Sequence, residues 1–158
     1  DKTGAELLSK FGYCFEQPED SNYVPILEGH ELEPEMPLQI EGAGGVIDCL
    51  PFRQIHGGGQ SLGLKFGSLV YATDVSEFPE SSLKYLEGLD VLVLGALRDT
   101  PHPCHFSVEQ ALEVIERYQP KRAILTHMHN NLDYQTLKNE LPPHVEPAYD
   151  GLVIEVEG

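Results

Sequence analysis

The chain has 158 residues, of which 41% are hydrophobic and 23% charged, as expected for one globular domain with a real core. Its 26 acidic and 10 basic residues give a formal net charge of −16. Contact with nucleic acid or anionic membranes needs clustered lysine and arginine, so this charge disfavours both as partners. No apolar run reaches the roughly 20 residues of a membrane helix, and we expect no signal peptide at the N-terminus.

The cysteines indicate a reducing compartment. Cys14, Cys49 and Cys104 are odd in number, far apart and without a CxxC spacing. Small secreted domains held by disulfides use cysteines in even numbers. We therefore expect a cytoplasmic protein.

The first half of the chain is expected to be rich in strands. A short helix is predicted at 3–11. Strands are predicted at 12–16, 24–32, 36–42 and 45–55, the last interrupted near Pro51. Alternation over 61–74 predicts a hairpin whose turn lies at Gly67 and Ser68.

In the second half, helices and strands alternate. A helix at 79–88 follows Pro79, and the continuously apolar 89–97 predicts a strand covered on both faces. Ser107 and Gln110 form a capping-box pattern at the start of a helix at 107–119. Further elements are predicted as a strand at 122–126, a helix at 133–141 and a strand at 151–157. This order indicates an α/β (α+β) fold with mixed sheets and helices on their outer faces.

Four polar residues stand where apolar strands stop or helices begin. They are His56, Asp74, His105 and His127. In layered α/β proteins such ends gather along one rim, where binding sites are built. Each could bind a metal ion or move a proton.

Each of these features also has an ordinary structural explanation. A single histidine after a strand is more often a hydrogen-bonded boundary residue than a ligand. Asp74 could be a helix cap or an Asx-turn residue, and the glycines at 57–59 have no phosphate-loop spacing. His30 and His144 lie in Glu- or Pro-rich loops and are predicted to be exposed to solvent.

Taken together, the segments HGGG, YATD, HFSVEQALEVI, AILTHMHN and AYDGLVIEV resemble the metallo-β-lactamase-fold hydrolases. The likeness is greatest to the PhnP-type phosphodiesterases, which act on cyclic phosphate esters such as phosphoribosyl cyclic phosphate. The resemblance implies an αββα-sandwich, of which residues 1–158 would be one domain portion, the C-terminal part. It implies a small anionic phosphate ester as the substrate.

The resemblance also implies roles for individual residues. The family holds two divalent metal ions under a bridging hydroxide. By this likeness, His56 is a ligand of one metal, Asp74 is a catalytic carboxylate that bridges both, and His127 is a ligand of the second. His105 is expected to be catalytic and substrate-binding, protonating the leaving oxygen or gripping the phosphate. Oxygen and imidazole ligands favour Mn²⁺ or Zn²⁺.

Two departures from the family pattern leave alternatives open. The signature H-x-H-x-D-H is absent from this sequence, so we expect the N-terminal half of the same protein to supply it. As a separate option for its assembly, the protein could form a homodimer. His129 is offset by one position from a second histidine of the family. The alternatives are a tRNA 3′-end nuclease-like or lactonase-like hydrolase, or a binding fragment without catalysis. The net charge argues against tRNA.

Overall fold

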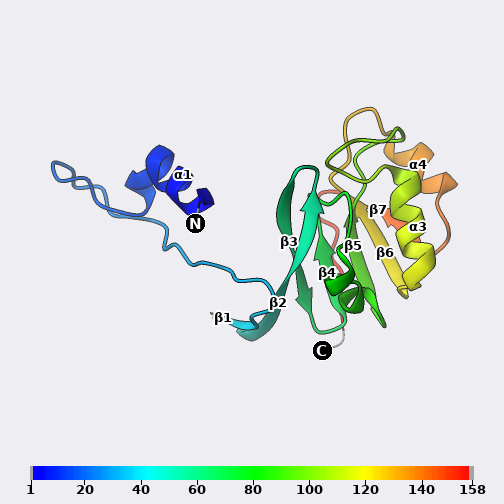
Figure 1. The fold of residues 1–158 in the computed structure, drawn as a ribbon, viewed down its shortest axis with the longest axis horizontal. Helices are drawn as coiled ribbons and strands as arrows, with labels where there is room; N and C mark the ends of the chain where they lie inside the picture. Colours follow the sequence, from blue (N-terminus) through cyan, green and yellow to red (C-terminus); the bar gives the residue numbers. More distant parts are fainter. Residues whose placement is uncertain (1, 157–158) are drawn as a thin grey trace. The chain divides into compact units, whose positions relative to one another are not determined.

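The structure, a computed structural model, describes residues 2–156. The chain folds as two compact units, Asp1–Leu32 and Glu33–Gly158 (Figure 1). The single domain portion predicted over residues 1–158 stays a prediction, because it concerns a domain that residues outside this sequence would complete.

The first unit contains helix α1 (Lys2–Phe11) and the 3₁₀ helix η1 (Gly12–Cys14). The helix predicted at 3–11 is confirmed. The strand predicted at 12–16 is wrong, because the amides of Phe15 and Glu16 both turn back to the carbonyl of Gly12.

The strand predicted at 24–32 is also wrong, since these residues form no strand. The amides of Ile26 and Leu27 both bond to the carbonyl of Cys14 instead of to a neighbouring strand. The side chain pattern resembled a strand, but Val24 and Ile26 are among the exposed hydrophobic residues, so no core orders this stretch as a strand.

The second unit is built on one seven-stranded sheet whose strands lie side by side in chain order, among the residues that the structure describes (Figure 1). The pairs from β1 to β4 are antiparallel, and those from β4 to β7 are parallel. The strands are β1 (Leu38–Gly42), β2 (Gly45–His56), β3 (Gly59–Phe66), β4 (Leu69–Ala72), β5 (Val91–Gly95), β6 (Arg122–Thr126) and β7 (Val145–Pro147).

The helices of this unit are α2 (Glu80–Leu83), the 3₁₀ helix η2 (Lys84–Leu86), α3 (Val108–Tyr118) and α4 (Tyr134–Glu140). The capping box of Ser107 and Gln110 is present at the start of α3, as predicted. Helix α3 packs its buried face, with Ala111 and Ile115, on one face of the sheet. No helix within residues 2–156 is long and apolar enough to span a membrane.

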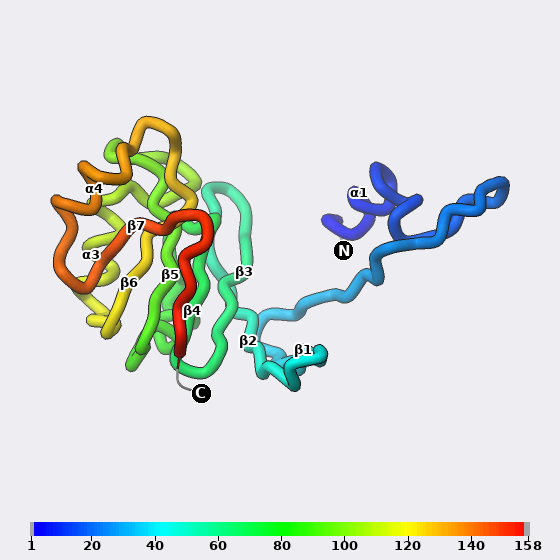
Figure 2. Tube along the Cα trace, turned by 180° about the vertical axis from the view of Figure 1, so that it is seen from behind, coloured from blue at the N-terminus to red at the C-terminus, as the bar shows by residue number. Residues whose placement is uncertain are grey.

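Strands β5 and β6 are buried on both faces, which explains their unbroken apolar sequences. Leu92 and Leu94 belong to the core cluster that includes α3, whereas Val91 and Val93 face the C-terminal segment. That segment, coloured red in Figure 2, runs along the sheet on the face opposite the helices and contributes Leu152, Ile154 and Val156. The predicted cover of both faces is confirmed.

The C-terminal segment is nevertheless not a strand. Through residue 156 it has no strand pairing, so the strand predicted at 151–157 is wrong; residue 157 lies outside the described residues. The seventh strand is β7, which no prediction included. Its short sequence VEP has a proline and no alternation that would mark a strand.

Strand β2 runs without a break through Pro51, contrary to the predicted interruption. The carbonyl of Pro51 accepts a hydrogen bond from the amide of Glu35, 2.7 Å away, and therefore points away from β3. In a strand the nitrogen of a residue points to the same side as its carbonyl. Proline here removes no hydrogen bond from the β2–β3 ladder.

The other predicted helices and strands are present, but most of them begin or end at slightly different residues. The hairpin turn lies at Gly67 and Ser68, and the helix predicted at 79–88 is divided into α2 and η2. The α/β class with a mixed sheet is confirmed.

Candidate metal centre

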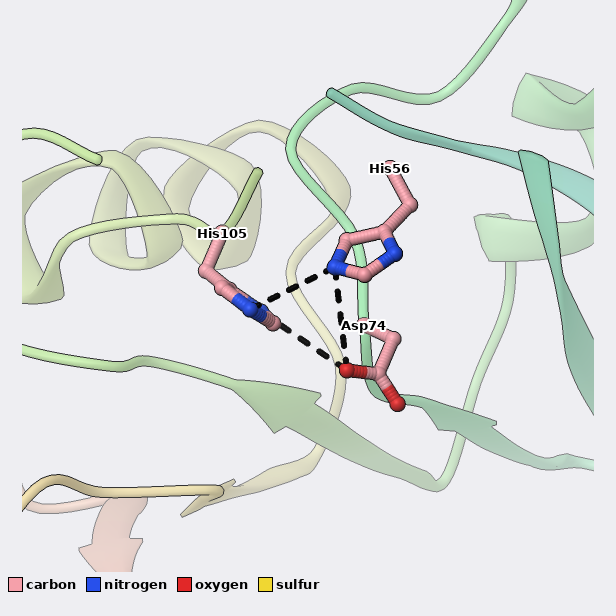
Figure 3. A group of neighbouring side chains, drawn as sticks. All are labelled: His56, Asp74 and His105. Carbon is pink, nitrogen blue, oxygen red and sulfur yellow. Dashed lines mark hydrogen bonds and ion pairs between the residues drawn. The ribbon is translucent and has the colours of Figure 1, made fainter. Parts of the chain in front are cut away.

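The sheet topology brings three strand ends to one edge. Strands β2 and β4 are each antiparallel to β3 and hence run the same way, and β4, β5 and β6 are parallel. His56 is the last residue of β2, Asp74 comes two residues after β4, and His127 directly follows β6. His105 reaches the same edge from the connection between β5 and α3 (Figure 3). The four side chains therefore lie close together at one edge of the sheet, as the sequence predicts.

One carboxylate oxygen is the centre of the group. Asp74 Oδ1 lies 3.8 Å from His56 Nε2, 3.9 Å from His105 Nδ1 and 3.6 Å from His127 Nε2. Figure 3 shows the first two imidazoles pointing toward this oxygen. A single acceptor therefore faces three imidazole nitrogens that come from separate parts of the chain.

His105 lies in the middle of the imidazoles. Its Nε2 is 3.3 Å from Nε2 of His56, and its ring centroid is 4.7 Å from that of His56 and 4.9 Å from that of His127. It is also the least exposed of the group, with 15% of its side chain accessible against 35% for His56. The ring centroid of a fourth histidine, His102, lies 5.2 Å from that of His105.

Burial and neighbouring charges affect the protonation of His105. Burial lowers the pKa of His105, as do the neighbouring His127 and His56, while the carboxylate of Asp74 acts in the opposite direction. The lowered pKa favours the neutral imidazole, which can bind a metal ion through one ring nitrogen and donate a hydrogen bond from the other.

Two residues of the group have strained backbone conformations. Asp74 has φ 52° and His127 has φ 60°, in the left-handed region that residues with a Cβ avoid at a cost of about 1–2 kcal/mol each. Such strain persists where the surroundings determine the conformation, and it is concentrated at functional sites. His127 directly follows β6 and Asp74 comes two residues after β4, so both strained residues lie where the chain leaves the sheet.

The glycine run after His56 has a packing role. Gly57 has φ 58°, and a Cβ at this position would lie 2.5 Å from Sγ of Cys104. Its amide also donates to the hydroxyl of Ser76, 3.1 Å away. Gly57 therefore lets the β2–β3 turn approach the segment that carries His105, and a phosphate is not needed to explain it.

The remaining histidines have different surroundings. Nδ1 of His102 accepts a hydrogen bond from the amide of Cys104, and His129 is exposed with its ring 2.8 Å from the Asn131 side chain. His30 is exposed, as predicted. The exposure predicted for His144 is wrong: it is half-buried, and its Nε2 has no hydrogen-bond partner among the described residues.

The sequence analysis did not identify the residues whose side chains form hydrogen bonds to the backbone at Thr73 and Asp74. Gln54 is fully buried and bonds both to Ser61 and to the carbonyl of Thr73, while Ser61 bonds to the carbonyl of Asp74. One signal was available. Gln54 occupies the same face of β2 as Phe52, so a polar side chain stands at a position where the alternation predicts an apolar one.

The donor set fits a divalent ion. The ligand atoms offered by His56, Asp74 and His105 all lie within 4.8 Å of one another, close enough to share one ion. A carboxylate with imidazoles suits Zn²⁺ or Mn²⁺. His127, the third predicted ligand, approaches the same carboxylate oxygen. Both His105 and His127 are therefore near enough to complete the site, and the predicted ligands His56, Asp74 and His127 and the role of His105 stay predictions.

The fold is the metallo-β-lactamase fold. A family model described as the beta-lactamase superfamily domain matches residues 1–128, and the chain belongs to this family. The family resemblance predicted from the sequence is confirmed.

Similar proteins support the family and the fold. A crystal structure of a diphosphatase from the PhnP family superposes with a TM-score of 0.85 at 30% identity, covering 99% of this chain and 56% of that one. The octanoyltransferase of Porphyromonas gingivalis is 30% identical over 139 residues, 85% of this chain and 27% of that protein. YhfI from Bacillus subtilis, a metallo-beta-lactamase fold protein, shares the fold at 17% identity, with a TM-score of 0.66 over 92% of this chain and 60% of its own. The chain therefore spans little more than half of the diphosphatase and about a quarter of the octanoyltransferase.

Proposed function

We propose that this chain is the C-terminal part of a cytoplasmic metal-dependent phosphodiesterase that hydrolyses small cyclic phosphate or nucleotide-like esters. The observation that carries the proposal is the convergence of three imidazoles on Oδ1 of Asp74 at the edge of the sheet. The likeness to a PhnP-family diphosphatase at 30% identity supports the choice of a phosphate ester.

His56, Asp74 and His127 would hold two divalent ions, Mn²⁺ or Zn²⁺, with the two oxygens of Asp74 available to both. Such a pair of ions lowers the pKa of a bound water and stabilises the attacking and leaving oxygens of an in-line displacement. The ions would also provide positive charge for an anionic substrate, which a chain of net charge −16 otherwise lacks.

His105 would act on the substrate. It lies two residues before Ser107, the N-cap of α3, and a helix N-terminus favours a nearby anion. There it would donate a hydrogen bond to a phosphate oxygen or a proton to the leaving alkoxide. Its position between the rings of His56 and His127 supports this role, because a small substrate bound at those rings would also lie near His105.

The proposal includes residues outside this sequence. Three ligands are few for two ions, and 44% of the PhnP-family diphosphatase has no counterpart here, since this chain covers 56% of it. We propose that the N-terminal half of the same protein supplies the missing ligands. Assembly as a homodimer stays a prediction, and neither a membrane nor a nucleic acid is proposed as a partner.

The test is hydrolysis by the full-length protein loaded with Mn²⁺ or Zn²⁺. We expect activity on bis(4-nitrophenyl) phosphate and on a ribose cyclic phosphate, and loss of both on treatment with a chelator. Hydrolysis of a lactone or of a tRNA 3′ trailer without activity on either phosphodiester would contradict the substrate class. Absence of bound metal would contradict the metal chemistry and favour a binding fragment.

A further inference from the structure

We propose that Gln54 and Ser61 are positioning residues that hold the backbone of Asp74 in its left-handed conformation and so orient the carboxylate toward the imidazoles. The metal-binding part of this inference rests on the proposed function. The conformational part rests on the hydrogen bonds alone.

A short chain of hydrogen bonds connects the core to Asp74. Gln54 and Ser61 are directly opposite each other on β2 and β3. Nε2 of Gln54 donates to Oγ of Ser61, 3.1 Å away, and to the carbonyl of Thr73, 2.9 Å away. The hydroxyl of Ser61 donates in turn to the carbonyl of Asp74 at 2.6 Å. Two side chains thus hold two consecutive carbonyls just after β4.

These are the carbonyls that must be held for the site to form. After Ala72 the chain leaves the strand and enters the left-handed region at Asp74, with φ 52°. A residue with a Cβ stays there only when its surroundings outweigh the local preference. Fixing the carbonyls of Thr73 and Asp74 on either side of the Asp74 Cα determines the direction of its side chain.

The sheet is built to admit the amide of Gln54. Gln54 is 0% exposed, and Gly63 on β3 leaves the room for its side chain. A Cβ at Gly63 would lie 2.7 Å from Oε1 of Gln54 and 2.3 Å from the ring of Phe52. Any larger residue at this position would displace the amide.

Burial of the Gln54 side-chain amide is unfavourable by itself. Oε1 of Gln54 has no hydrogen-bond partner among the residues that the structure describes. Burial of an unpaired acceptor is unfavourable, and an apolar side chain of the same length would avoid it. What the amide contributes is its two donated hydrogen bonds, both of which serve the segment at residues 73–74.

The experiment compares three serine variants of the full-length protein. Ser61→Ala removes the hydroxyl that holds Asp74, and Ser61→Thr keeps a hydroxyl. Ser82→Ala is the matched control, because Ser82 is buried and, like Ser61, donates to a backbone carbonyl, that of Arg53 on β2, at 2.7 Å. Mn²⁺ affinity is measured by electron paramagnetic resonance. The conformation of Asp74 in the metal-free protein is followed by the intraresidue amide–Hα NOE, which is strong at positive φ.

We expect Ser61→Ala to weaken Mn²⁺ binding roughly 10–100-fold, as loss of a residue that orients a ligand does, and to weaken the NOE of Asp74. Ser61→Thr should remain close to wild type in both. Ser82→Ala should lower the melting temperature and leave both unchanged.

Two outcomes would overturn the inference. One is an unchanged NOE of Asp74 in Ser61→Ala, and the other is a loss of Mn²⁺ affinity in Ser82→Ala equal to that in Ser61→Ala. If the wild-type protein bound no Mn²⁺, the proposed function would fail. The NOE comparison would then still decide whether Ser61 positions Asp74.

Discussion

At the scale of single residues, the site consists of one carboxylate surrounded by imidazoles that play different parts. Asp74 is half-exposed and offers Oδ1 to three rings, whereas His105 is the most enclosed of the rings. The difference in burial agrees with the roles proposed for them. A bridging carboxylate must reach ions near the surface, and an enclosed ring makes a stronger hydrogen bond to a bound phosphate than an exposed one.

We predict that Asp74→Asn lowers the affinity for both metal ions together. The amide keeps the shape of the side chain but removes the charge and one of the two acceptor oxygens. Elemental analysis of the purified full-length protein checks this, with wild type prepared in parallel. Retention of two ions per chain in the variant would disprove the bridging role of Asp74.

We predict that His127→Ala and His105→Ala differ in what they lose. His127→Ala should lose metal and all activity together. His105→Ala should keep its metal and lose roughly 10²–10⁴ in rate on an alkyl phosphodiester. On a nitrophenyl ester the loss should be clearly smaller, because that leaving group needs no proton.

Metal content and the rates on both esters decide between these roles. Loss of metal from His105→Ala would instead make it a ligand, as its closeness to His56 and Asp74 would allow. Equal losses on both esters with metal retained would assign His105 to phosphate positioning.

At the scale of elements, the two helices that follow His105 and His127 in the chain, α3 and α4, each begin at a polar capping residue. Ser107 caps α3 just after His105 and is 1% exposed. Asp133 caps α4, accepting hydrogen bonds from the amide and the hydroxyl of Thr136 at 2.9 and 2.8 Å. The start of each helix is thereby tied to a polar side chain.

We predict that the α4 cap weakens in acid. The hydrogen bonds from Thr136 hold the pKa of Asp133 below its ordinary value of 3.8. Since the folded pKa is the lower one, the stabilisation is complete above pH 3.8 and is lost as the pH falls through the folded value. The protection factors of the α4 amides, which relate each exchange rate to the intrinsic rate at the same pH, should therefore fall at low pH.

Asp133→Asn is the matched control for this cap, because asparagine caps a helix without titrating. Its α4 amides should lose less protection in acid than those of wild type. The same loss of protection in both proteins would show that Asp133 is not the group responsible.

At the scale of the whole molecule, core and site belong to one of the two compact units. Every residue of the two core clusters, and every residue of the candidate metal centre, lies in Glu33–Gly158. Helix α1 of the other unit has no buried residue, and its Leu7, Leu8 and Phe11 are exposed.

We predict that deletion of residues 1–32 leaves a cooperatively folding protein. Because none of the described residues 2–32 belongs to either core cluster, the melting temperature should change little. Thermal unfolding followed by circular dichroism, compared with the 158-residue chain, is the measurement. Loss of the cooperative transition would show that the first unit stabilises the second.

The sequence by itself determined the elements whose signals are local. The capping box of α3, the hairpin turn at Gly67 and the unbroken apolar run of β5 depend on residues close together in the chain, and all three are present. It also marked His56, Asp74, His105 and His127, because the four occur together at strand ends and a helix start in the order that resembles the family.

Only the tertiary structure decided the rest, because it depends on partners distant in sequence. Residues 24–32 and 152–156 have the composition of strands, yet neither finds a neighbouring strand to pair with. The approach of three imidazoles to within 3.6–3.9 Å of one oxygen of Asp74 depends on the strand directions, which no local pattern contains. The support of Asp74 by Gln54 and Ser61 likewise joins residues from β2, β3 and the end of β4, and a sequence read along the chain shows no link between them.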